Sequence, residues 1–199
     1  MFHDRQTLSD LIGSRICHDL ISPLGAISNG LELLTMTGIE NSPELDLIAQ
    51  SVENANSKIR FFRIAYGRAP HGTTLARAEI CSVLGDYFKG GRHQIDWKPS
   101  HELQRREVRL AFLAIQCLES AMPFGGLIEI AINGQAWELS AKSDKFRDQS
   151  PLWAVLSGEN REDEVAASDV QFAVFASLAQ FRKTKPMVEQ GADAITLRF

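Results

Sequence analysis

The sequence predicts a helical part followed by an α+β sandwich: an antiparallel hairpin of two helices, then helices packed on one face of a sheet. The hairpin is predicted by two long stretches whose apolar residues alternate at spacings of three and four, with a short loop between them. The sandwich is predicted by strand-like and helix-like stretches that alternate after residue 75, including an Asn133-Gly134 turn. The stretch 67–74 has the composition of a loop. We therefore predict one domain over residues 1–70 and a second over residues 75–199.

The first helix is expected over residues 7–36. Thr7 and Asp10 can form a capping box at its start. The turn at residues 37–41 ends this helix, because Gly38 can adopt the left-handed conformation that stops one.

The second helix is expected over residues 43–66, with Ser42 as its N-cap and Pro43 as its first residue. Both helices carry an apolar seam of the a/d kind. One hairpin cannot bury two such seams well, whereas two copies can do so as a four-helix bundle, so we predict a homodimer. In the alternative, residues 70–199 cover the seams within a monomer. The seam positions are Cys17, Leu20, Leu24, Ile27, Leu31 and Leu34 in the first helix and Leu45, Ile48, Val52, Ala55, Ile59, Phe62 and Tyr66 in the second.

The second part alternates helices and strands, which predicts helices on one face of a mostly antiparallel sheet. Helices are expected over residues 75–89, 103–122, 151–156 and 170–183, and strands over residues 93–98, 127–132, 136–141 and 194–199.

The composition excludes several classes of protein. The chain of 199 residues has 44% hydrophobic and 23% charged residues and a net charge of -4, so nucleic acid is not an expected partner. The three cysteines, Cys17, Cys81 and Cys117, are far apart, which indicates neither a disulfide framework nor a zinc site. The sequence contains neither a start resembling a signal peptide nor an apolar run long enough to cross a bilayer. We expect a cytoplasmic protein without a membrane partner.

His18 is the most informative residue of the first helix. It lies beside the seam and is expected to face solvent, among small or polar neighbours on the same face. Such a face lets another macromolecule approach the imidazole, with Arg15 able to steady an anion and Ile21 and Ala26 able to add apolar contact. The neighbours of His18 on this face are Ser14, Arg15, Ser22, Gly25 and Asn29.

Two further residues bear on the chemistry of His18. An imidazole can act as a nucleophile through one ring nitrogen when an acceptor holds the other, and Asp19 could be that acceptor, although consecutive helical residues diverge by about 100°. Pro23 lies inside the helix, at a cost of about 3 kcal/mol, and removes the hydrogen bond to the carbonyl of Asp19. Its purpose is either a bend that opens the backbone near His18 or a tolerated kink.

The motif His-Asp-Leu-x-x-Pro-Leu-x-x-Ile, which begins at His18, resembles the H-box of histidine kinase dimerisation domains. The extended pattern, residues 15–23 followed by Asn-Gly-Leu-Glu-Leu-Leu at residues 29–34, is similar to the ChpT family of bacterial histidine phosphotransferases. The resemblance extends to the layout of the whole chain, and implies that the second domain is a degenerate form of a histidine kinase ATPase domain.

The resemblance implies a function for His18. A phosphoaspartate in the receiver domain of a hybrid histidine kinase would phosphorylate it, and His18 would then donate to the aspartate of a downstream response regulator. Arg15, Asp19, Ser22 and Asn29 would orient the ring or contact the receiver, and the face also carries the docking candidates Ser14, Ile21 and Gly25. The required Mg²⁺ would belong to the receiver, so we expect no cofactor or metal in this chain.

The second domain lacks the residues that a kinase of this kind needs to bind ATP. The helix that would carry the nucleotide-binding Asn has Gln116 and Glu119 instead, and Asp144 is not followed by the expected glycines. We therefore expect a fold kept without nucleotide binding. Two alternatives stay open: an ATP-dependent histidine kinase, and a non-catalytic protein that docks on a kinase or receiver and inhibits it. A cluster at Arg60, Arg63 and Arg68 could also attract an acidic receiver surface.

Overall fold

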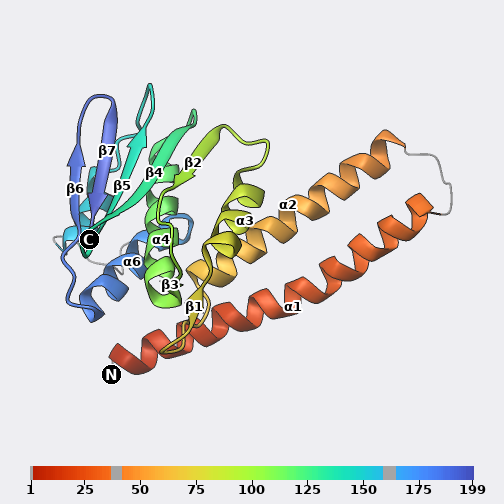
Figure 1. Ribbon diagram of the computed structural model, residues 1–199, viewed down its shortest axis with the longest axis horizontal. Helices are drawn as coiled ribbons and strands as arrows, with labels where there is room; N and C mark the ends of the chain where they lie inside the picture. Colours follow the sequence, from red (N-terminus) through yellow and green to blue (C-terminus); the bar gives the residue numbers. More distant parts are fainter. Residues whose placement is uncertain (1, 37–41, 159–164) are drawn as a thin grey trace.

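The computed structural model describes residues 2–36, 42–158 and 165–199, with side chains from residue 13 onward. Helix α1 (Phe2–Met36) and helix α2 (Pro43–Ala65) form a long hairpin that extends away from the rest of the chain (Figure 1). The predicted turn at residues 37–41 lies outside the described residues. The predicted capping box is wrong, because α1 begins at Phe2 and Thr7 therefore lies inside it. No proline or glycine interrupts residues 2–7, so the helix continues back to Phe2.

The start of α2 is confirmed as predicted. Ser42 has the extended backbone of an N-cap, its hydroxyl oxygen accepts a hydrogen bond of 3.3 Å from the N–H of Leu45, and Pro43 opens the helix. In α1, the helix runs through Pro23 without ending. The hairpin therefore forms from local signals that the sequence displays.

The remainder of the chain is a sandwich of helices on one face of a sheet (Figure 1). The large sheet has the order β2-β4-β5-β7-β6, in which only the pair β2-β4 is parallel, and β1 and β3 form a separate two-stranded sheet. This confirms a mixed helical and mostly antiparallel fold. The helices are α3 (Arg77–Phe88), α4 (Arg105–Ala121), α5 (Ser150–Ser157), α6 (Val170–Phe181) and the short 3-10 helix η2 (Ala167–Asp169), and the strands are β1 (Thr74–Leu75), β2 (His93–Trp97), β3 (Leu103–Gln104), β4 (Gly126–Asn133), β5 (Ala136–Lys142), β6 (Met187–Gln190) and β7 (Ala194–Arg198).

Helix α4 is the centre of the sandwich. Its residues 108–115 are at most 4% exposed, because α2, α6 and the sheet pack around it. The opposite face of the sheet is polar, and there Glu129 accepts hydrogen bonds of 2.6 Å and 2.5 Å from Lys98 and Lys142. The sheet therefore has one apolar face toward the helices and one charged face away from them.

The end of α2 is part of the same core. Phe61, Ile64 and Ala65 are at most 2% exposed, and the ring of Phe61 lies 4.1 Å from that of Tyr87 in α3 and 4.6 Å from that of Phe112 in α4. Aromatic contacts of this kind join the hairpin to the sandwich. The division of the chain into two domains stays a prediction.

Candidate functional site

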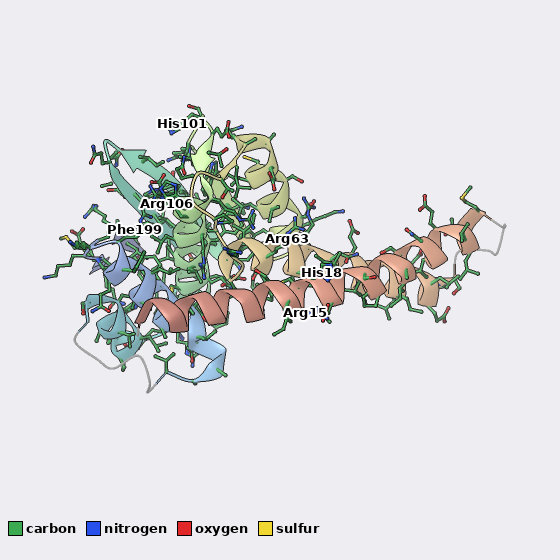
Figure 2. The ribbon with its side chains drawn as sticks, turned by 90° about the horizontal axis from the view of Figure 1, so that it is seen from below. Arg15, His18, Arg63, His101, Arg106 and Phe199 are labelled. Carbon is green, nitrogen blue, oxygen red and sulfur yellow. The ribbon has the colours of Figure 1, made fainter. Side chains whose placement is uncertain are left out.

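His18 stands out from the hairpin. Its side chain, labelled in Figure 2, is 82% exposed, whereas the neighbouring Cys17 is 6% exposed. Burial raises the pKa of the Cys17 thiol, with a smaller opposing effect from the positive charge of Arg63. The seam therefore turns His18 outward as the spacing predicts, and it brings the last turn of α2 close to the histidine turn of α1.

Asp19 links Arg15 to His18. Its Oδ2 accepts a hydrogen bond of 2.7 Å from Arg15 Nε, and its Oδ1 lies 3.3 Å from His18 Nδ1. These two contacts, that of Arg15 foremost, lower the pKa of the Asp19 carboxyl. An ionised acceptor beside Nδ1 favours the proton on that nitrogen, which leaves the lone pair on Nε2.

The other predicted neighbours spread along the same face of α1. Ser22 and Asn29 are exposed, and a Cβ added at Gly25 would meet nothing within 4 Å. Asn29 is eleven residues from His18, or about 16 Å along the helix axis, so it lies beyond reach of the ring. Ile21 is half-buried. The structure thus brings Arg15 and Asp19 to His18 and leaves an open, small-residue surface further along.

Ser14 has a partner within the chain. Its hydroxyl oxygen accepts a hydrogen bond of 2.9 Å from the backbone N–H of Arg68, in the turn after α2. Its side chain therefore anchors α1 to that turn, a role that sequence reasoning missed because the two residues lie far apart along the chain.

The three arginines near and just after the end of α2 differ in their surroundings. Arg60 donates hydrogen bonds to Asp86 and Ser82 of α3, so its charge is paired within the chain. Arg63 and Arg68 are exposed. Only the latter two are therefore placed to attract an acidic surface.

Sequence reasoning also missed Arg105 and Arg109 of α4. Arg105 donates to the carbonyls of Arg63 and Arg68, and Arg109 donates to the carbonyl of Ala65. A signal was present, because Arg109 interrupts an otherwise apolar run over residues 108–115.

Gln116 and Glu119 are engaged with tyrosines. The hydroxyl of Tyr66 donates a hydrogen bond of 2.8 Å to Gln116 Oε1, and that of Tyr87 donates one of 3.1 Å to Glu119 Oε2. Burial raises the pKa of the Glu119 carboxyl, although the charge of His93 and the Tyr87 hydrogen bond oppose this shift. These two polar side chains of α4 therefore join α4 to α2 and α3.

Two negative findings apply to the described residues. Among those with described side chains, His, Cys, Asp and Glu nowhere gather in threes that could hold a metal ion. Neither α1 nor α2, nor any shorter helix in the described ranges, combines the length and the apolar character that a membrane span needs.

Comparison with known proteins identifies relatives along nearly the whole chain. Residues 77–193 match the family described as "Histidine phosphotransferase C-terminal domain". The protein phosphotransferase ChpT of Brucella abortus (strain 2308) is 31% identical over 194 residues, which cover 94% of this chain and 92% of that protein. A solved structure described as a bacterial phosphotransferase superposes with a TM-score of 0.67 at 27% identity, and covers 93% of this chain and 91% of its own. The chain therefore belongs to the histidine phosphotransferase family.

Proposed function

We propose that this protein receives a phosphoryl group on His18 from the phosphoaspartate of a receiver domain and passes it to the aspartate of a second receiver. The observation that carries this proposal is the arrangement of His18: an imidazole that is 82% exposed, with the carboxylate of Asp19 beside Nδ1. Family membership supports the same activity.

The proposed step is an in-line displacement at phosphorus. The lone pair on Nε2 of His18 attacks the phosphorus of the acyl phosphate, the bond from phosphorus to the aspartyl oxygen breaks, and the receiver's carboxylate leaves with the electron pair. Asp19 holds the proton on Nδ1 and balances the positive charge that the ring gains. In the second half of the relay, the carboxylate of the next receiver attacks the same phosphorus and Nε2 leaves.

The neighbours of His18 take supporting roles. Arg15, one turn away and 77% exposed, can turn from Asp19 toward the transferred phosphoryl oxygens. Ser22, Gly25 and Asn29 form the surface on which the receiver docks, with Ile21 giving apolar contact. We assign the required Mg²⁺ to the receiver, which has the acidic ligands for it.

We also propose that the second domain does not bind ATP. Gln116 and Glu119 occupy the helix that would carry the nucleotide-binding Asn, and both are bonded to tyrosines of neighbouring helices. Helix α6 packs directly on α4, with Phe172 and Phe175 fully buried. This packing disfavours the alternative of an active kinase.

The surface of the hairpin supports a homodimer. Every second seam residue of α1 faces α2: Cys17 is buried, and Leu24 and Leu31 are half-buried. The seam residues between them face solvent, since Leu20 and Ile27 are each 47% exposed. Leu34 continues this stripe with 39% exposed, and Ile48 of α2 is 46% exposed. The sandwich packs on the end of α2, where it also partly buries the seam residues Phe62 and Tyr66. It leaves Leu20, Ile27 and Ile48 exposed, so the covering that the monomer alternative requires reaches only the end of the seam. A second copy of the hairpin would complete a four-helix bundle.

The test of the main proposal is phosphoryl transfer in solution. A receiver domain labelled at its aspartate is mixed with the protein, and an acid-labile label should appear on wild type and be absent from His18→Ala. His93→Ala is the control for loss of an unrelated histidine. If wild type acquires no label from any phosphorylated receiver and yet binds it, the inhibitor alternative is correct. If label appears from ATP without a receiver, the protein is a kinase.

A further inference from the structure

We infer that Arg105 and Arg109 are positioning residues for phosphotransfer: they lock the second domain to the end of α2 and so hold it in a fixed place beside His18. This inference rests on the proposed function. It goes beyond that function because it assigns residues remote from the imidazole to the geometry of the receiver's approach.

The first step is the capping of α2. The last carbonyls of a helix have no partner within it and carry partial negative charge. Arg105 Nη2 donates a hydrogen bond of 3.0 Å to the carbonyl of Arg63, and Arg109 Nε donates one of 3.1 Å to that of Ala65. A guanidinium suits this place because its donors form a rigid fork and its charge is permanent.

The second step is the turn that follows α2. Arg105 Nε donates a hydrogen bond of 3.3 Å to the carbonyl of Arg68, so this one side chain joins the helix to the turn. The backbone N–H of Arg105 also donates to the carbonyl of Thr73. The start of α4 is thereby bonded to both ends of the stretch between the hairpin and the second domain.

Both arginines are at least partly removed from water. Arg109 is 4% exposed and Arg105 is half-buried. Burial lowers the pKa of Arg105, and the positive charges of Arg63 and Arg109 act in the same direction. Since charge in such surroundings is costly unless it is hydrogen-bonded, the carbonyls hold the two guanidinium groups firmly in place.

The third step leads to His18. The N–H of Arg68 donates to Ser14 Oγ, four residues before His18, and the side chain of Arg63 lies close enough to Cys17 to influence its thiol. The two residues whose carbonyls accept from Arg105 are therefore the one that bonds to Ser14 and the one whose charge acts on Cys17. Figure 2 labels His18 on α1, Arg63 on α2 and Arg106 at the start of α4.

The consequence concerns docking. A receiver that binds at His18 and also contacts the second domain finds that domain already held in one position. The second domain therefore loses no orientational freedom when the receiver binds. If the second domain swung freely, each encounter would have to order it first. The locked joint should therefore lower KM for the receiver while leaving the chemistry at His18 unchanged.

The test compares Arg105→Met with Arg106→Met. Each substitution removes one positive charge, and the two residues are adjacent in sequence, but Arg106 is exposed. Spin labels are placed at two exposed positions, Gln50→Cys on α2 and Asn133→Cys on the second domain, in a Cys81→Ser background and diluted with unlabelled protein. The distance distribution should be narrow in wild type and in Arg106→Met and should broaden in Arg105→Met. Equal widths in all three proteins would overturn the inference.

A kinetic arm separates positioning from stability. Arg105→Met should raise KM for a phosphorylated receiver by about tenfold and leave kcat nearly unchanged. Labelling of His18 by phosphoramidate, which does not dock, should be unaffected. Arg105→Lys should reverse only part of the increase in KM, because an ammonium cannot donate to two carbonyls with the fixed geometry of a guanidinium. A fall in kcat and in phosphoramidate labelling together, with KM unchanged, would show a merely structural role and overturn the inference. If wild type takes no label from any receiver, the proposed function fails, and the distance measurement still decides whether the joint is locked.

Discussion

Gly13 of α1 packs against the backbone carbonyl of Tyr66, so closely that a Cβ added at Gly13 would lie 2.9 Å from the Tyr66 oxygen. This is the point where α1 crosses the end of α2, one residue before Ser14 bonds to Arg68. The absence of a side chain at residue 13 therefore sets how near the histidine turn comes to the joint between the hairpin and the sandwich.

We predict that Gly13→Ala destabilises the protein although alanine is the better helix former. The free energy of unfolding should fall by about 1–2 kcal/mol, because the overpacking destabilises the folded state more than the higher helix propensity of alanine stabilises it. Urea unfolding followed by circular dichroism measures it. Gly30→Ala is the matched control, since a Cβ there meets nothing within 4 Å, and it should gain up to about 1 kcal/mol. Equal stabilisation by both substitutions would contradict the close approach.

Asp19→Asn should slow the transfer of a phosphoryl group to His18 by about tenfold, because an amide balances the positive ring less well than a carboxylate. Hydrogen bonds from Arg15 and His18 lower the pKa of Asp19, so this carboxyl stays ionised between about pH 5 and 8. The deficit of the variant should therefore be constant over that range in single-turnover rates. Glu32→Gln, which likewise replaces a carboxylate by an amide at an exposed site further along α1, serves as the control. A deficit that vanishes toward pH 8 would argue against the assigned role.

Gly25→Leu should weaken receiver docking without harming the fold. Residue 25 is two turns beyond His18 on the same face, and the space around it is empty. A leucine there should raise KM for the phosphorylated receiver by about tenfold, while phosphoramidate labelling stays normal. Gly30→Leu makes the same change about 120° around the helix from His18 and should have little effect on KM. Similar KM values for both variants would place the docking surface elsewhere.

The sequence allowed the hairpin to be predicted well because its signals are local. Ser42 and Pro43 mark a helix start within a few residues, and the seam repeats over three heptads. Strands β1, β3 and β6 were missed, because two to four residues are too few to show an alternating pattern and their partners are distant in sequence. The start of α1 was misplaced because a good capping pair at Thr7 competes with a segment that is itself helix-compatible.

The candidate site likewise combines features that the sequence predicts with features that it does not predict. The exposure of His18 and its contact with Asp19 follow from helix periodicity and adjacency. The bond from Arg68 to Ser14 and those from Arg105 and Arg109 to the end of α2 depend on how the sandwich packs against the hairpin, which periodicity does not encode. An arginine inside an apolar helix is nevertheless a usable signal, because a buried guanidinium needs acceptors and helix C-termini supply them.

Ile27→Asp should shift the protein from dimer to monomer. Ile27 is 47% exposed in the open stripe of α1, and a carboxylate placed there would be buried without a partner in a four-helix bundle. Sedimentation equilibrium measures the change, and the dimer dissociation constant should rise by at least about a hundredfold. Ala26→Asp, at an exposed neighbouring position outside the stripe, is the control and should remain dimeric. A monomeric wild type, or two variants with equal dissociation constants, would refute a dimer formed through this stripe.

Glu119→Gln should stabilise the protein at neutral pH. Burial raises the pKa of Glu119 in the folded chain, so the folded state binds the proton more tightly than the unfolded state. Stability from this group is therefore complete below the ordinary pKa of a glutamate and is lost as the pH rises through the elevated folded value. Glutamine stays neutral and its Oε1 can still accept the hydrogen bond from Tyr87. The midpoint of thermal unfolding should accordingly exceed that of wild type by about 2–4 °C at pH 7.5 and match it near pH 4. Glu79→Gln, at an exposed position of α3, should show no such gain. A variant less stable than wild type at pH 7.5 would mean that the ionised carboxylate stabilises the joint between α3 and α4.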